Sequence, residues 1–159
     1  MRNTPSAIAI AVIAAAGLAY GVAAQQKAPA AAAALPKVTV YKTSSCGCCR
    51  LWVDHMKKSG FDVQAMDVSS ADVRAVSKAA GLKDEDTSCH TAKVGSYTVE
   101  GHVPADDIKR MLKEKPAIAG IAAAGMPQGS PGMEQGTKEP YDVVAFKKDG
   151  TTTVFAKHK

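Results

Sequence analysis

The sequence predicts an α/β fold with a mixed β-sheet flanked by helices. The folded part of the chain opens with a strand-helix-strand-helix pattern and closes with a hairpin pattern. A helical crossover requires the first two strands to pair in parallel, whereas a hairpin pairs its strands antiparallel. Both kinds of pairing are therefore expected in one sheet.

The first half of the folded part contains two predicted strands and two predicted helices. The segments 37–42 (KVTVYK) and 61–68 (FDVQAMDV) alternate between apolar and polar residues, which is typical of strands. The helix between them is expected to be capped by one of the serines 44–45 and to end at Gly60. A second helix is predicted over 70–81, which starts with serine and ends with glycine.

The second half is richer in strands. A third strand is predicted over 94–103, and Pro104 opens a helix with acidic residues in its first turn. The glycine- and proline-rich segment 120–140 is predicted to be irregular, and 141–156 to form a hairpin that turns at Asp149-Gly150. A parallel β-α-β half followed by strands that end in a hairpin predicts a thioredoxin-like sandwich.

The N-terminus has the features of an export signal. Residues 1–24 combine Arg2 with an alanine-rich apolar run and a small-residue ending, and we interpret them as a cleaved signal peptide rather than a membrane anchor. Residues 25–36 form an alanine- and proline-rich linker, and 37–159 form the folded domain. These features predict a periplasmic protein of the bacterial cell envelope, without stable membrane insertion after cleavage.

The charge pattern argues against a nucleic-acid partner. The formal net charge of the full chain is +5, and its lysines are scattered among acidic residues without a basic block.

The four cysteines are the residues most informative about function, because three of them are clustered within four positions. They are Cys46, Cys48, Cys49 and the remote Cys89. In an exported protein, four cysteines usually indicate two disulfides. Here Cys48 and Cys49 are neighbours, and Cys89 can bridge only one of the three, so a disulfide framework is the weakest reading.

A dithiol redox pair is the second interpretation. Cys46 and Cys49 form a C-x-x-C at the first strand-to-helix turn, where a helix N-terminus lowers thiol pKa values. The loop that carries Cys89 is expected to face the same turn. Against a redox enzyme, Cys48 is a spare thiol beside the pair, and 88–91 (SCHT) has no proline where thioredoxin-type enzymes carry one.

A soft-metal site is the third interpretation, and it uses every cysteine. Adjacent cysteines point apart on a helix, so they suit several bridged ions better than one tetrahedral zinc. Thiolates and thioethers select Cu(I), and about four thiolates would neutralise about four such ions. We therefore predict copper, as Cu(I), in a multinuclear thiolate cluster.

Four further side chains are candidate ligands. His90 follows Cys89 directly, and His102 ends the predicted third strand. Met126 and Met133 lie in the irregular GMPQGSPGME segment, where a helix core cannot explain them.

Three motifs in this order resemble a known family. The segments 46–63 (CGCCRLWVDHMKKSGFDV), 88–112 (SCHTAKVGSYTVEGHVPADDIKRML) and 125–134 (GMPQGSPGME) are similar to those of the exported copper-resistance proteins called CopG. The resemblance covers most of 37–156. It implies a thioredoxin-like fold, copper binding through the CxCC and Cys-His motifs, and a role in copper tolerance.

The sequence thus predicts an exported copper-resistance protein that binds and sequesters Cu(I) through the CxCC and Cys-His motifs. Its expected partners are copper ions and other envelope proteins that handle copper. Storage, delivery and redox interconversion of copper are all compatible with these motifs. The alternative is an envelope thiol-disulfide oxidoreductase that uses Cys46 and Cys49.

Overall fold

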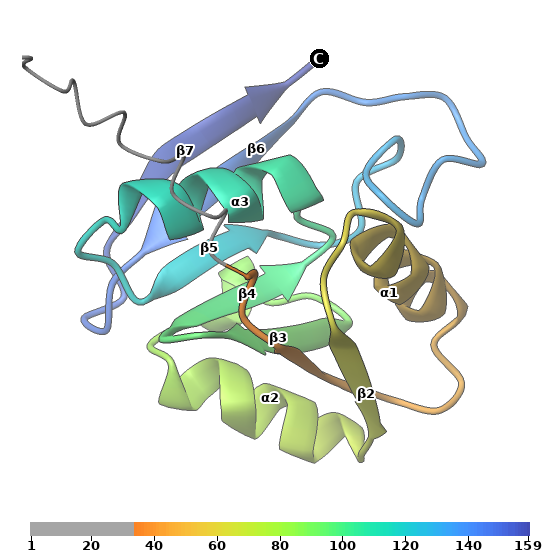
Figure 1. Ribbon diagram of the computed structural model, residues 1–159, viewed down its shortest axis with the longest axis horizontal. Helices are drawn as coiled ribbons and strands as arrows, with labels where there is room; N and C mark the ends of the chain where they lie inside the picture. The colour runs from red at the N-terminus through yellow and green to blue at the C-terminus, as the bar shows by residue number, and fades with distance from the viewer. Residues whose placement is uncertain (1–33) are drawn as a thin grey trace, which may run out of the picture. The chain divides into compact units, whose positions relative to one another are not determined.

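Seven strands form one mixed β-sheet in the computed structural model, which describes residues 34–159. The strands are β1 (Val38–Lys42), β2 (Val63–Asp67), β3 (His90–Val94), β4 (Tyr97–Gly101), β5 (Gly120–Ala123), β6 (Tyr141–Phe146) and β7 (Thr152–His158). Their order in the sheet is β2-β1-β3-β4-β5-β6-β7 (Figure 1). The predicted signal peptide and residues 25–33 of the predicted linker lie outside the described residues.

Three helices cover the two faces of this sheet. They are α1 (Gly47–Lys58), α2 (Ser70–Ala79) and α3 (Ala105–Glu114), and a short 3-10 turn spans Asp84–Asp86. Buried residues of α1 and α3 share one core cluster, whereas α2 contacts β1 and β3 from the other side (Figure 1). Among the described residues, no helix is long and apolar enough to cross a membrane.

Alternation along the strands separates the two faces. Val40 and Ala92 point toward α1 and α3, where they pack in one cluster with Trp52 of α1. Thr91 points to the opposite face, where its hydroxyl oxygen lies 2.7 Å from that of Ser77 on α2. The larger core therefore lies between the sheet and the two helices α1 and α3.

The predicted α/β, thioredoxin-like fold class is confirmed. The strands β1 and β2 pair in parallel across α1, and β6 and β7 form the predicted C-terminal hairpin with its turn at Gly150. The predicted serine cap of the first helix is wrong. Ser44 and Ser45 form a turn instead, and the N-cap is Cys46, whose side chain accepts the hydrogen bond that a serine cap would have accepted.

The predicted single strand over 94–103 is also wrong. This region belongs to an antiparallel hairpin of β3 and β4, which turns after Val94 at Gly95, a residue with φ +59. The hairpin begins at His90, earlier than predicted. The prediction started too late because His90 and Thr91 are polar and therefore resemble loop residues in the sequence, although both are fully buried.

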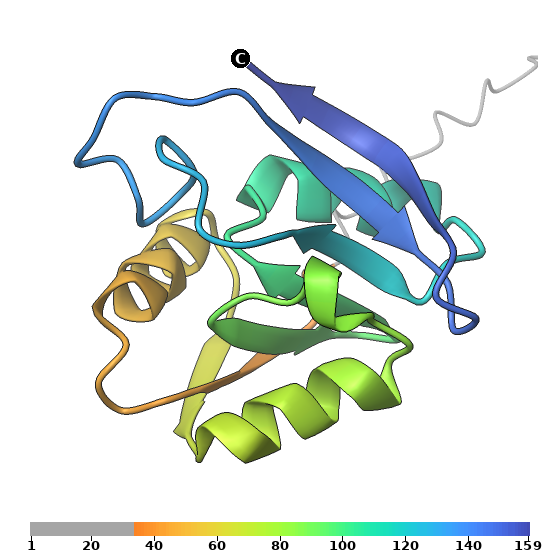
Figure 2. The same ribbon diagram turned by 180° about the vertical axis from the view of Figure 1, so that it is seen from behind.

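The segment 120–140 is not irregular throughout. Its first residues form β5, which pairs in parallel with β4 after the crossover through α3. All four residues of β5 are buried, because the strand is covered on both faces. A strand of this kind lacks the alternation by which a half-exposed strand is recognised. The rest of the segment, 124–140, runs beside α1 in both views (Figures 1 and 2).

Candidate metal centre

Three cysteines lie where β1 leads into α1. Cys46 is the N-cap of α1, and its Sγ accepts a hydrogen bond from the backbone N–H of Cys49 at 3.3 Å. The Cys49 side chain is fully buried, whereas Cys46 and Cys48 are partly exposed. The start of the helix thus presents sulfur atoms both to the core and toward the surface.

The strand register brings the fourth cysteine to the same place. β1 and β3 are antiparallel with Lys42 opposite His90, so Cys89, just before β3, lies beside the end of β1. Its Sγ lies 3.4 Å from Cys49 Sγ and 3.9 Å from Cys48 Sγ. All four cysteine sulfur atoms lie within 4.8 Å of one another. The name sulfur group is used below for Cys46, Cys48, Cys49 and Cys89.

The sulfur group contains one disulfide. Cys46 and Cys49 are bonded to each other, while Cys48 and Cys89 are free thiols. Opening this bond takes two electrons and two protons and would leave four thiols in one place. In the disulfide form, two of the four sulfur atoms are not available as thiolate ligands.

The orientation of His102 is fixed by a hydrogen bond to a backbone carbonyl. Its Nδ1 lies 2.7 Å from the Pro131 carbonyl oxygen, which can only accept, so Nδ1 carries the proton. Its Nε2 then presents a lone pair 3.2 Å from Cys89 Sγ. Burial lowers the pKa of His102, which keeps the ring neutral. A neutral imidazole fixed through its other nitrogen is a common form of a metal-binding histidine.

His90 forms a second group with Cys89 and His102 that could hold a metal ion. Its Nδ1 lies 3.5 Å from Cys89 Sγ, and its buried Nε2 has no hydrogen-bond partner among residues 34–159. Burial, and then the neighbouring His102, lower the pKa of His90 to about 3. The ring of Trp52 packs against it, with 4.5 Å between ring centroids. His90 is therefore neutral and held in place.

Cys89 is the sulfur that both groups share. Burial, and then the neighbouring Cys48 thiol, raise the pKa of Cys89 to about 12. The thiol is protonated near neutral pH. A metal that binds it must displace the proton, which a soft cation can do.

The two candidate methionines differ in position. Met126 is half-exposed, and its Sδ lies 3.9 Å from Cys48 Sγ. Within residues 34–159, the Met133 sulfur makes no comparable contact with a cysteine, and its backbone instead closes the loop through bonds to Ser130 and Gly129. The structure therefore brings one of the two methionines to the sulfur group.

The loop that carries both methionines packs closely on α1. A Cβ at Gly132 would lie 2.8 Å from the Cys48 carbonyl oxygen and 3.0 Å from the Trp52 backbone nitrogen. Only glycine allows this approach, and φ at Gly132 is +89. This close packing of Gly132 on α1 fixes the position of the neighbouring Pro131 carbonyl, which contacts His102.

Glu100 was not predicted from the sequence, and its side chain binds the backbone of the residue before Cys89. This fully buried carboxylate accepts hydrogen bonds from the Ser88 N–H at 2.7 Å, from Thr91 Oγ1 at 2.7 Å and from Ser77 Oγ at 3.0 Å. It therefore ties the residue before Cys89 to β3 and α2. The alternating sequence 98–101 (TVEG) does not indicate that Glu100 is buried, because an acidic residue in a strand usually faces solvent.

Comparisons with known proteins agree with these motifs. A family model described as "Protein of unknown function, DUF411" matches residues 87–133. No curated protein matches the chain. Two solved structures, titled "Copper resistance protein copG- Form 1" and "Form 2", are each 38% identical to it, with TM-scores of 0.72 and 0.70. The first match covers 78% of this chain and 98% of that one, and the second covers 79% and 98%.

This identity extends over nearly the whole length of both solved proteins. The chain belongs to the CopG family of copper resistance proteins.

Proposed function

We propose that this chain is an exported copper-binding protein that binds Cu(I) through the sulfur group. The observation that carries the proposal is the approach of four cysteine sulfur atoms to within 4.8 Å of one another. Three come from the start of one helix, and the fourth, Cys89, lies just before β3, 40 residues after Cys49. Such convergence is expected of a shared ligand set.

The chemistry of the donors favours Cu(I). Thiolates and thioethers are soft ligands, and the Met126 sulfur lies beside Cys48. Four thiolates with about four Cu(I) ions would have no net charge, which lowers the cost of burial. Neighbouring sulfur atoms at 3.4–3.9 Å suit ligands that are shared between ions.

The disulfide supports a redox role beside binding. Two Cu(I) ions that become Cu(II) release two electrons, and the Cys46–Cys49 disulfide takes up two electrons to give two thiolates. The neutral imidazoles of His90 and His102 suit Cu(II) better than thioethers do. Copper could therefore change oxidation state without leaving the centre.

The proposal includes a location and partners. The signal-like N-terminus supports export to the periplasm, where copper ions and envelope proteins that carry copper would be the partners. Sequestration there would contribute to copper tolerance, in line with the names of the two similar copper resistance proteins.

Single substitutions test the shared-ligand proposal. After anaerobic reduction and Cu(I) loading, Cys48→Ser and Cys89→Ser should each lower the copper content per chain. The control is Ser45→Ala, an exposed neighbour of the cysteines, which should load like the parent. Unchanged copper content in both cysteine variants would overturn the proposal.

A thiol-disulfide oxidoreductase is the second candidate, because Cys46 and Cys49 are already paired at a helix N-terminus. This function predicts that Cys48→Ser keeps full disulfide reductase activity toward an external dithiol or disulfide substrate. The copper proposal predicts instead that the parent chain has little such activity and loses copper on that substitution.

A further inference from the structure

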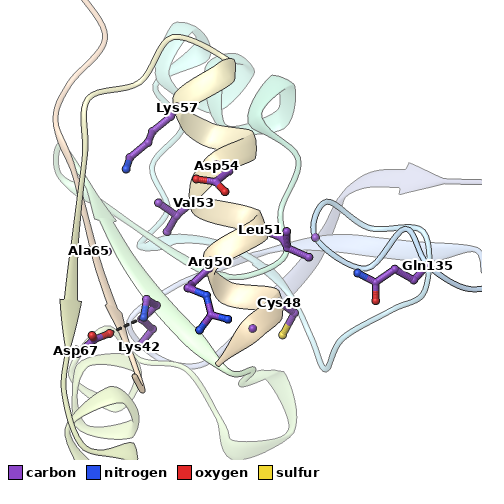
Figure 3. Close-up of a pocket in the computed structure, with 12 residues that line it drawn as sticks. Lys42, Cys48, Arg50, Leu51, Val53, Asp54, Lys57, Ala65, Asp67 and Gln135 are labelled. Atoms are coloured by element: carbon purple, nitrogen blue, oxygen red, sulfur yellow. Dashed lines mark hydrogen bonds and ion pairs between the residues drawn. The ribbon is translucent and has the colours of Figure 1, made fainter. Parts of the chain in front are cut away.

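A cavity of about 640 Å³ opens beside α1, on the surface side of the sulfur group. It lies between α1, the ends of β1 and β2, and the loop that contains Gly132 (Figure 3). Its volume is within the range of about 300–1,000 Å³ that is typical of small-molecule sites. One helix, two strands and one loop bound the cavity, and several of the side chains that line it, Arg50 and Asp54 among them, are exposed to solvent.

One face of α1 supplies charges of both signs to this cavity. Arg50, Asp54 and Lys57 are exposed and follow one another at helical spacing, so they line the same side (Figure 3). Among residues 34–159, none of the three forms an ion pair within 4.0 Å. The other two charges of the cavity, Lys42 and Asp67, neutralise each other through a salt bridge. The cavity therefore offers two unpaired cations and one unpaired anion.

Cys48 connects the cavity to the sulfur group. It lines the cavity, and its Sγ also lies 3.6 Å from Cys46 Sγ and 3.9 Å from Cys89 Sγ. Its thiol is free and partly exposed. A molecule in the cavity thus reaches the metal centre through Cys48 without entering the core.

We propose that this cavity binds a small zwitterionic thiol, such as cysteine or a short cysteine-containing peptide, that exchanges Cu(I) with Cys48. Arg50 and Lys57 would bind carboxylates of the ligand, and Asp54 its ammonium group. The thiol is the group that can carry a soft cation to another thiol. This inference rests on the proposed function, because it adds an exchange ligand to the same copper centre.

The exchange step balances without electron transfer. The bond between Cu(I) and the ligand sulfur breaks, a bond between Cu(I) and Cys48 Sγ forms, and the Cys48 proton passes to the released ligand sulfur. Copper remains Cu(I) throughout, and the free thiol of the ligand leaves the cavity.

Binding can be measured without copper. The probe is the S-methyl form of the tripeptide γ-glutamylcysteinylglycine, which has two carboxylates and an ammonium group but cannot exchange with the disulfide. It should shift the amide NMR signals of 47–57 in the metal-free chain. The double variant Arg50→Gln/Lys57→Gln should weaken binding about threefold to thirtyfold, the loss expected for two exposed ion pairs.

A charge-matched control separates the cavity from the overall charge. Lys113→Gln/Lys147→Gln removes two exposed cations outside the cavity lining and should bind the probe like the parent. The inference is overturned if the probe leaves 47–57 unshifted, or if both double variants weaken binding equally. Copper loading from a Cu(I)–acetonitrile complex should be equal in all three proteins, and its failure in the parent would contradict the proposed function instead.

Discussion

Replacing Gly132 with alanine should disturb the packing between the 124–140 segment and α1. The new Cβ would meet two backbone atoms, the Cys48 carbonyl oxygen at 2.8 Å and the Trp52 nitrogen at 3.0 Å, so the loop or the helix must move. The positive φ costs alanine about 1–2 kcal/mol, and forced overpacking typically costs about 1–3 kcal/mol more. The expected loss in the free energy of unfolding is therefore about 2–5 kcal/mol.

Gly60→Ala is the matched control. Its φ of +92 is close to that of Gly132, but no heavy atom lies within 4 Å of the position of its Cβ. It should lose only the backbone term. For a domain of this size, about 1 kcal/mol lowers Tm by about 3–6 °C, so Gly132→Ala should unfold at least about 3 °C below Gly60→Ala. Thermal unfolding of the metal-free proteins measures the difference, and equal losses would refute the close-packing argument.

The same pair of variants tests the role of the loop at the metal centre. A loop displaced by Gly132→Ala carries the Pro131 carbonyl away from His102 Nδ1. His102 then loses the partner that fixes its Nε2 toward Cys89, and loss of such a partner typically costs about 10- to 100-fold in metal affinity. Competition with a chromophoric Cu(I) chelator should detect this loss in Gly132→Ala and not in Gly60→Ala. Equal affinities would show that the loop does not orient His102 for copper.

Two further predictions follow from single contacts. Met126→Leu should speed copper release, because it removes the thioether beside Cys48, whereas Met133→Leu should release copper like the parent; stopped-flow transfer to a chelator measures both, and equal rates would remove Met126 from the ligand set. Trp52→Phe should lower the free energy of unfolding by about 1–3 kcal/mol, because it leaves the buried Val103 carbonyl without its indole N–H donor at 2.8 Å; urea unfolding measures the loss, and an unchanged midpoint would contradict it.

The fold could be predicted from the sequence where the residues of a strand alternate in polarity and where helices have clear ends. The segments 37–42 and 61–68 alternate, and 70–81 has both an N-cap and a terminal glycine. The strand β5 was missed because its four small or apolar residues are buried on both faces. The start of β3 was missed because His90 is polar, and its burial depends on Trp52 and His102, which are far away in sequence.

The part of the site that depends only on the order of strands and helices could be predicted from the sequence. The approach of Cys89 to the CxCC motif followed from the expected topology, and the register of β1 and β3 accounts for it. The different positions of Met126 and Met133 were not predictable, because both lie in one loop whose path depends on the fit of Gly132 against α1. The support from Glu100 likewise arises from tertiary hydrogen bonds that leave no sequence pattern.

The central claim is that the four cysteine sulfur atoms bind several Cu(I) ions together. X-ray absorption at the copper edge, on reduced protein loaded anaerobically, tests it most directly together with the copper-to-protein ratio. The account predicts more than one copper ion per chain, sulfur-dominated coordination and copper–copper scattering from ions that share thiolates. A single copper ion per chain with nitrogen or oxygen ligands, and a Cys46–Cys49 disulfide that persists under these conditions, would contradict it.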